Sequence, residues 1–277
     1  MRYLSFKRPD GTPTFGRLAG DRVFDLGTPG EASWLRDAIA GGALGALTDG
    51  QAYALDSVDL LPVIPNPGKI LCIGLNYASH IAEMGRENKG YPAVFTRWAD
   101  TLVAHGAPLI RPRDGHEFDY EGELAVIIGK GGRHIPQAEA LDRIAGYAVF
   151  HDASLRDWQR HNSQFTPGKN FPGTGGFGPA LVTPDEIDDL GVQRVQTRLN
   201  DALMQDQPVS DLIHDVPALI AYCSSFTELR PGDVIATGTP GGVGLGRTPT
   251  VFMKAGDRVE VSIGVIGTLT NTVIDEA

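Results

Sequence analysis

Three carboxylates stand at alternate positions in Asp119-Tyr120-Glu121-Gly122-Glu123, directly before an apolar run at residues 124–128. Such a run, with Val and two Ile, predicts a strand, in which successive side chains point to opposite faces. Asp119, Glu121 and Glu123 are therefore expected to point the same way, with neighbours about 7 Å apart. Buried carboxylates at that spacing raise one another's pKa unless a cation lies between them, and oxygen ligands suit Mg²⁺, Mn²⁺ or Ca²⁺ better than zinc. The alternative is a solvated strand face with ordinary surface acids.

A further acid, Asp152, follows a second apolar run at residues 145–150 and is the third candidate metal ligand. His151 lies beside it and could bind zinc or support a neighbouring ligand. A histidine near a strand end is more often a satisfied polar residue, so we assign His151 no role.

His80 and Glu83 lie three residues apart in a helix predicted to cover residues 78–84. Side chains at that spacing can touch. A carboxylate beside an imidazole fixes its tautomer and raises its basicity, which is the arrangement of a general base. For an isolated pair at this spacing, a plain surface interaction is the commoner explanation.

Two glycine-rich loops offer groups that could bind an anion. Lys169 lies in the loop 166–173, where a lysine could hold a carboxylate or stabilise an oxyanion. The loop 236–244 follows a predicted strand and combines backbone N–H groups with the hydroxyls of Thr237 and Thr239. Most loop lysines are merely solvated, so Lys169 alone decides nothing.

The composition narrows the class of protein. The chain has 277 residues, of which 42% are hydrophobic and 21% charged, as in ordinary globular proteins, and its 35 glycines and 19 prolines favour a turn-rich β architecture. A formal net charge of −10 argues against a nucleic-acid or anionic-membrane partner but allows a small anionic substrate held by local cations. The sequence has no apolar run near the roughly 18 residues of a membrane span and no signal-peptide core, so we predict a cytoplasmic protein.

The prolines at residues 62–67 suggest a boundary between two domains. Residues 1–62 predict a small α+β N-terminal domain, whose helix has Ser33 as its expected N-cap. Residues 66–277 predict a larger domain in which strands outnumber helices without regular alternation, so a mixed, mostly β fold is favoured over a doubly wound sheet. The expected strands are 69–74, 93–96, 123–128, 145–150, 195–199, 234–236, 258–263 and 267–274, and the expected helices are 78–84, 155–160 and a segment opened by Asp215-Val216-Pro217.

Together these residues resemble the fumarylacetoacetate hydrolase family, with matching order and spacing from about residue 69 onward. The matching segments are Gly74-Leu75-Asn76-Tyr77 with His80 and Glu83, residues 119–129, Asp152-Ala153-Ser154 with Asp157-Trp158-Gln159, Gly168-Lys169-Asn170-Phe171, residues 178–183 and residues 232–244. The resemblance implies a catalytic domain of the β-sandwich roll type in a homodimer. Residues 1–62 look like the N-terminal domain of bacterial members.

The resemblance also implies roles for individual residues. The cofactor would be Mg²⁺ or Mn²⁺, with water completing its coordination, and the partner would be a small anionic 2-oxo acid. The implied roles are metal ligands at Glu121, Glu123 and Asp152, a base dyad of His80 and Glu83, and substrate contacts from Lys169 and Thr239.

The expected reaction is hydrolysis of a 2,4-dioxo acid of the acylpyruvate or fumarylpyruvate type. Water activated by His80 and oriented by Glu83 would attack the C4 carbonyl, the C3–C4 bond would break, and pyruvate and a carboxylic acid would leave. The same family contains isomerases and decarboxylases, so the fold does not name the reaction. The alternative is isomerisation or decarboxylation of a diacid such as 2-hydroxyhepta-2,4-diene-1,7-dioate or oxaloacetate, in the breakdown of aromatic compounds.

A non-catalytic metal-binding protein is a third possibility, but it would need neither the His80–Glu83 dyad nor Lys169. The sequence leaves open the acyl group of the substrate and the choice between Mg²⁺ and Mn²⁺. It also leaves open which group reads the distal end of the substrate, with candidates at Arg86, Lys89, Arg160 and Gln164.

Overall fold

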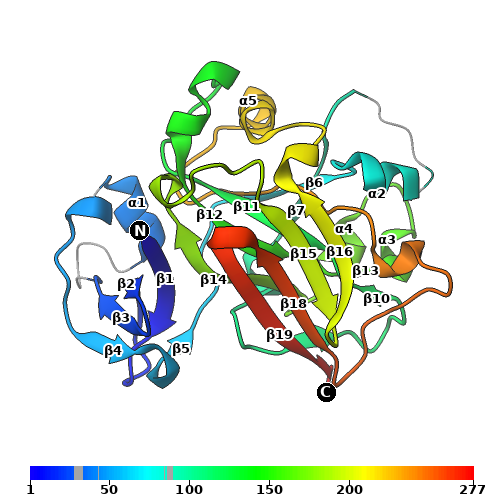
Figure 1. The fold of residues 1–277 in the computed structure, drawn as a ribbon, viewed down its shortest axis with the longest axis horizontal. Helices are drawn as coiled ribbons and strands as arrows, with labels where there is room; N and C mark the ends of the chain where they lie inside the picture. The colour runs from blue at the N-terminus through cyan, green and yellow to red at the C-terminus, as the bar shows by residue number, and fades with distance from the viewer. Residues whose placement is uncertain (28–33, 43, 84, 86–89) are drawn as a thin grey trace.

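The computed structural model describes residues 1–27, 34–42, 44–83, 85 and 90–277, and its largest element is a 12-stranded mixed sheet (Figure 1). In sheet order the strands are β4 (Ala52–Ala54), β3 (Arg22–Asp25), β2 (Pro13–Ala19), β1 (Arg2–Lys7), β14 (Gly175–Val182), β12 (Ile144–His151), β11 (Gly122–Ile128), β17 (Val234–Ala236), β6 (Ile70–Gly74) and β7 (Ala93–Arg97), with β5 (Asp59–Leu60) beside β1 and β8 (Leu102–Val103) beside β14.

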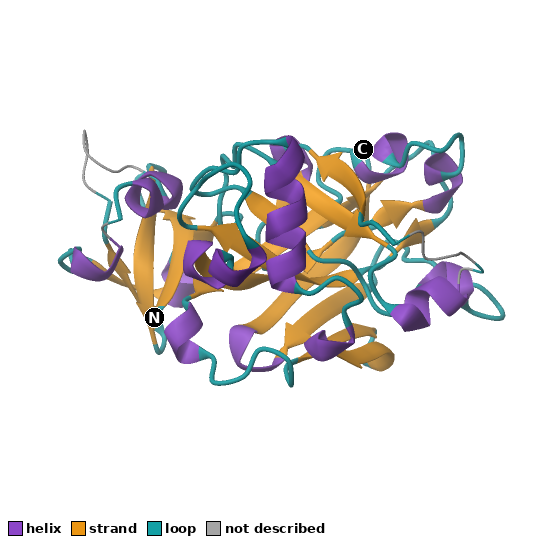
Figure 2. Cartoon of the chain, turned by 90° about the horizontal axis from the view of Figure 1, so that it is seen from above, coloured by secondary structure: helices purple, strands orange, loops and turns teal. Residues whose placement is uncertain are grey.

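A second, five-stranded sheet packs on one face of the large sheet, which gives the molecule its sandwich character. Its order is β16 (Ala202–Pro208), β15 (Arg194–Leu199), β18 (Arg258–Ile263), β19 (Gly267–Asp275) and β9 (Leu109–Arg111), while β10 (Phe118–Asp119) pairs with β13 (Ser154–Leu155). The α-helices are α1 (Leu35–Ala40), α2 (Ala78–Glu83), α3 (Arg156–Gln159), α4 (Thr166–Lys169) and α5 (Val216–Phe226), and Figure 2 shows them around the strands.

The prediction of a mixed, mostly β fold is confirmed, and each expected strand agrees with an observed one to within one residue at either end. Among the strands of seven or more residues, β14 and β16 were not predicted, and several strands of two or three residues were also missed. The sequence of β14, Gly-Gly-Phe-Gly-Pro-Ala-Leu-Val, is rich in residues that usually mark turns, and β16 contains the polar run Gln-Asp-Gln.

The helix predictions are also largely correct. The side chain of Asp215 accepts a hydrogen bond from the backbone N–H of Ala218 at 2.8 Å and so caps α5, with proline in its first turn. Lys169, expected in a loop, lies in the one-turn helix α4. The expected N-cap Ser33 lies outside the described residues.

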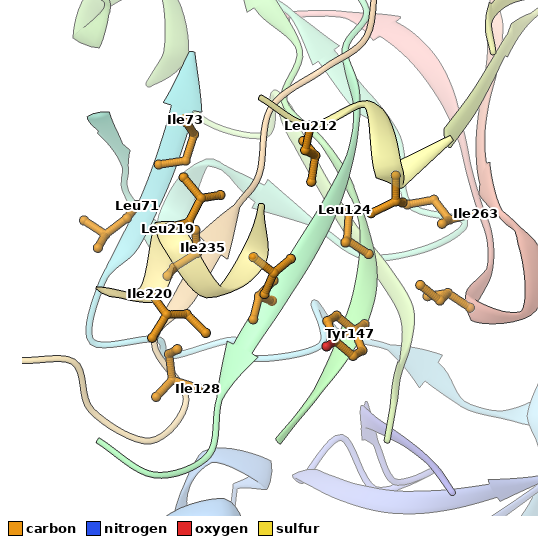
Figure 3. Close-up of a cluster of buried hydrophobic side chains, with 14 of the residues drawn as sticks. Leu71, Ile73, Leu124, Ile128, Tyr147, Leu212, Leu219, Ile220, Ile235 and Ile263 are labelled. Atoms are coloured by element: carbon orange, nitrogen blue, oxygen red, sulfur yellow. The ribbon is translucent and has the colours of Figure 1, made fainter. Parts of the chain in front are cut away.

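The large sheet is covered on both faces, which explains why its central strands are continuous apolar runs. On one face, side chains such as Ile73, Leu124 and Ile235 pack against Leu219 of α5 and Ile263 of the second sheet (Figure 3). The other face packs against Leu35 and Ile39 of α1 and against Val63 and Ile64.

The N-terminal strands are continuous with the large sheet, because β1 pairs with β14 at Arg2↔Val182 and Tyr3↔Leu181. The large sheet therefore runs across the predicted boundary, and the division into domains at residues 1–62 and 66–277 stays a prediction. Within the described residues, no helix has the length and apolar character needed to cross a membrane.

Candidate active site

Four neighbouring strands of the large sheet have one terminus each on the same side of the sheet, where the strand ends lie next to one another. β11 and β12 are antiparallel, with Gly122 opposite His151, so the start of one lies beside the end of the other. β17 is antiparallel to β11 through Ala125↔Ala236, and β6 is parallel to β17 through Ala236↔Cys72, so both of these strands end at the same edge. The polar segments that flank these four strand ends are thereby brought together.

An acidic cluster forms at this edge from Glu121, Glu123 and Asp152. Each residue offers a carboxylate oxygen, and the three oxygens lie within 4.8 Å of one another. All three side chains are buried, with at most 4% of each residue exposed. Buried oxygen ligands at this separation are suited to a hard divalent cation. The structure therefore brings together the three residues predicted as metal ligands.

Asp119 does not join this cluster of three, although its carboxylate and that of Glu121 contact the same guanidinium, that of Arg156. Residues 120–121 separate β10 from β11 and interrupt the alternation of the strand. The Asp119 carboxylate instead accepts hydrogen bonds from the backbone N–H groups of Gly244 at 2.7 Å and Leu245 at 3.0 Å, and from Nε of Arg156 at 2.8 Å. Asp119 therefore anchors the glycine-rich loop that follows β17 next to the acidic cluster.

Buried cations surround the acidic cluster. Arg97 donates to Asp152 at 2.6 Å, and Arg156 lies 2.7 Å from Glu121. Lys169 bridges these two carboxylates, with Nζ 2.5 Å from Glu121 and 2.6 Å from Asp152. A carboxylate has about four lone-pair positions, so these contacts leave room for a metal bond.

The cations divide the cluster into two electrostatic environments. Burial alone would raise the pKa of Glu121, but Arg156 and Lys169 outweigh it and place the pKa well below its ordinary value. Burial raises the pKa of Glu123, the like charges of the other two cluster carboxylates raise it further, and the backbone N–H of Gly238 that donates to it at 2.9 Å offsets this only in part. Glu123 is therefore the cluster carboxylate whose negative charge a bound cation would do most to stabilise.

His80 and Glu83 form the predicted pair on α2. Nδ1 of His80 lies 3.4 Å from Oε2 of Glu83, and the Glu83 carboxylate accepts hydrogen bonds from the backbone N–H of Gly242 at 3.0 and 3.2 Å. The backbone N–H of Gly242 thus fixes the carboxylate of Glu83 in its position beside the imidazole. This arrangement leaves Nε2 of His80 as the ring nitrogen that can take or give a proton.

Lys169 and Thr239 lie at the site, but their donors are already engaged. The ammonium of Lys169 has three donors, and beside the two carboxylates it contacts the backbone oxygen of Asp152 at 3.2 Å. The hydroxyl of Thr239 donates to the backbone oxygen of Gly122 at 2.9 Å. Neither group can donate to a substrate oxygen without giving up one of these contacts.

A cavity of about 430 Å³ opens onto the acidic cluster. It is large enough for a small acid, and its lining is part apolar and part polar or charged. Its lining combines Ile73, Gly74, Leu75, Phe95, Phe165 and Leu245 with His80, Glu121, Glu123, Arg156, Gln159, Arg160, Asn162, Ser163, Lys169 and Thr239.

Three site residues were missed in the sequence: Arg97, Arg156 and Gln205. Arg97 ends an apolar strand just as Asp152 does, so the signal that identified the aspartate was present for the arginine too. Arg156 opens a short helix four residues after Asp152, and nothing in its neighbourhood predicts that it is only 2% exposed. Gln205 comes from β16, a strand that was itself not predicted.

Gln205 ties the acidic strand to the loop that follows β17. Its Oε1 accepts from the backbone N–H of Gly122 at 3.0 Å, and its Nε2 donates to Thr239 Oγ1 and to the backbone oxygen of Pro240, both at 2.8 Å. Gly122 is the residue between Glu121 and Glu123. The amide of Gln205 thus fixes the spacing of two cluster carboxylates.

We expect Gln205→Leu to weaken divalent-metal binding by about 10-fold or more, the usual cost of losing a group that orients metal ligands. The change removes the amide and leaves the Gly122 N–H without its partner. Isothermal titration of Mn²⁺ into metal-free protein measures the effect. Gln207→Leu, at a half-buried position on the same strand, is the matched control. Equal metal affinity in the two variants would contradict this role.

The fold and site define a class: a β-sandwich protein with a buried carboxylate cluster and a histidine–glutamate pair facing one cavity. The family model for the fumarylacetoacetate hydrolase C-terminal domain matches residues 69–274, and the chain belongs to this family. The small N-terminal region lies outside the matched residues.

Three similar proteins bear on the reaction. The chain is 41% identical over 220 residues to the mitochondrial oxaloacetate tautomerase fahd2 of Xenopus laevis, covering 79% of this chain and 69% of that protein. It is 42% identical over 226 residues to the oxaloacetate tautomerase YisK of Bacillus subtilis, covering 80% and 75%. A crystal structure of maleylpyruvate hydrolase from Sphingobium sp. SYK-6 with manganese(II) and pyruvate superposes over both whole chains with a TM-score of 0.80 and 27% identity.

Proposed function

We propose that this protein is a divalent-metal-dependent tautomerase or isomerase of an oxaloacetate-type 2-oxo acid. The observation that carries the proposal is that His80, backed by Glu83, lines the same cavity as the buried acidic cluster. A proton donor and acceptor next to a site for a chelating acid is what keto–enol conversion needs. The names of the two relatives support the isomerase alternative better than hydrolysis, which was the first expectation from the sequence.

Glu121, Glu123 and Asp152 would hold Mg²⁺ or Mn²⁺. When bound, the cation would act as a Lewis acid toward the oxygen atoms at the 2-oxo end of the substrate. The chain's own residues supply the rest: Nε2 of His80 takes a proton from C3 of the keto acid and delivers it to the 2-oxygen, or the reverse. The product is isomeric with the substrate, so no co-reactant is consumed.

The surrounding residues prepare the site for this proton transfer. Glu83 keeps the Nδ1 proton of His80 on the far side of the ring, so that Nε2 is the working nitrogen. Arg97, Arg156 and Lys169 keep the cluster carboxylates in place through charged hydrogen bonds. Burial of the cluster limits the access of water to the substrate.

Hydrolysis of a 2,4-dioxo acid is the second candidate. The similar crystal structure is that of a maleylpyruvate hydrolase, and the same His80–Glu83 pair could activate a water molecule instead of moving a proton on the substrate. Decarboxylation makes no use of a base beside C3, so it explains less of the site.

The test incubates the Mn²⁺-loaded protein in deuterated water with oxaloacetate and, separately, with an acylpyruvate. We expect the enol absorbance of oxaloacetate to decay faster than it does without the protein, and deuterium to be incorporated at C3. Pyruvate should form no faster than its spontaneous rate. Pyruvate plus a free acid from the acylpyruvate at a much higher kcat/KM would assign the protein to hydrolysis, and fast release of carbon dioxide would assign it to decarboxylation.

We also propose a homodimer, since β-rich folds need their strand edges covered. Light scattering should give twice the chain mass of 29.6 kDa, and a mass near 29.6 kDa at micromolar concentration would contradict it. A cytoplasmic location stays a prediction.

A further inference from the structure

The cavity contains one arginine that is not committed to the acidic cluster. Among the described residues that line the cavity, Arg156 and Lys169 are buried and directed at cluster carboxylates. Arg160 pairs instead with Glu117, which lies outside the cluster, at 2.6 Å from Nη2 to Oε2. Its side chain is 49% exposed, so the guanidinium is within reach of a bound ligand.

The position of Arg160 is set by helix α3. Its backbone N–H donates to the backbone oxygen of Arg156 at 3.2 Å, so the two arginines lie one helical turn apart. Residues at this spacing lie on the same side of a helix. Both arginines line the cavity, but Arg156 contacts Glu121 in the acidic cluster, whereas Arg160 contacts Glu117 outside it.

The remaining candidates for reading the distal end of a substrate are less suited. Arg86 and Lys89 lie outside the described residues. Gln164 lines a neighbouring hollow with Trp98 and Trp158 rather than this cavity. Among the described candidates, Arg160 is the one that lines the cavity, with its side chain half exposed and ion-paired with Glu117 alone among the described residues.

We propose that Arg160 determines specificity by binding the distal carboxylate of a dicarboxylic 2-oxo acid whose other end meets the acidic cluster. The inference rests on the proposed function for its reaction, but the binding step can be tested without any turnover. A guanidinium has five N–H donors, so Arg160 can take a ligand carboxylate while it still contacts Glu117. The negative charge of Glu117 opposes the ligand and limits its affinity.

The test compares two ligands of equal chain length. Isothermal titration of the Mn²⁺-loaded protein measures the binding of 2-oxoglutarate, which has a distal carboxylate, and of 2-oxopentanoate, which lacks one. We expect Arg160→Gln to weaken 2-oxoglutarate binding by about 10-fold, the worth of one charged hydrogen bond. Binding of 2-oxopentanoate should change by less than about 2-fold on the same grounds.

Glu117→Gln is the matched variant with the opposite expected sign. It keeps the shape of the side chain and removes the competing charge, so 2-oxoglutarate should bind more tightly while 2-oxopentanoate is unaffected. Because this variant leaves Arg160 intact, it tests the idea even if Arg160→Gln folds poorly.

Three results would overturn the inference: equal affinity of the unaltered protein for both ligands, an equal loss for both in Arg160→Gln, or weaker 2-oxoglutarate binding in Glu117→Gln. Failure of the proposed function is a separate result. It would appear as absent tautomerisation by the unaltered protein, with the ligand preference and its dependence on Arg160 still in place.

Discussion

Replacing Glu123 by glutamine should abolish tight divalent-metal binding and, with it, measurable turnover. Glu123 supplies one of three buried oxygens that lie within 4.8 Å of one another. A neutral amide of the same shape removes one of the three negative charges that attract the cation. We expect the loss to exceed the roughly 100-fold that removal of a mere supporting group costs at a metal site.

Metal content by elemental analysis, metal affinity by titration and turnover together measure this effect. Glu139→Gln is the matched control, because the Glu139 side chain is 54% exposed and pairs with Arg143 on the surface. The control should keep both metal and activity. Full activity after exhaustive chelation, or in Glu123→Gln protein that holds no metal, would refute the role of the cluster.

The sequence predicted the parts of the site that follow directly from strand periodicity. Glu123 and Asp152 flank apolar runs with sharp ends, so their places at the ends of β11 and β12 could be predicted before any pairing was known. The His80–Glu83 pair followed in the same way from helical spacing. In each case the signal lies within about ten residues of the functional group.

What the sequence did not predict depends on contacts between distant segments. Arg97, Arg156 and Gln205 are polar residues that become buried only when β7, α3 and β16 pack around the cluster. The hydrogen bonds that Asp119 accepts from the backbone N–H groups of Gly244 and Leu245 likewise join segments far apart in the sequence. A buried polar residue in sequence is indistinguishable from an exposed one until its partner is known.

The reaction was the least predictable feature, for a chemical reason. A chelating carboxylate cluster and a histidine base serve hydrolysis and proton transfer alike. The expectation of hydrolysis came from the base dyad, and the similar tautomerases shift the proposal to proton transfer with the same residues in the same roles. The difference between these reactions lies in what His80 acts on, which is either a water molecule or C3 of the substrate.

Replacing His80 by alanine should therefore separate proton transfer from metal binding. His80 lines the cavity and faces Glu83, but it is not one of the three clustered oxygen ligands. We expect turnover to fall by roughly 10²–10⁴-fold, the usual worth of general acid–base catalysis, while Mn²⁺ affinity stays unchanged.

Steady-state kinetics and metal titration on the same preparation give the two readouts for His80→Ala. His116→Ala, at an exposed position, is the control and should leave both values unchanged. Turnover of Glu83→Gln should lie between that of His80→Ala and that of the control, because the imidazole keeps its position but loses the carboxylate that fixes its tautomer. In the proposed reaction, His80 is the group that exchanges a proton with C3 of oxaloacetate. Deuterium incorporation at C3 should therefore decline in parallel with turnover in His80→Ala. Loss of Mn²⁺ binding in this variant, with turnover restored by excess metal, would show that the histidine supports the metal rather than moving the proton.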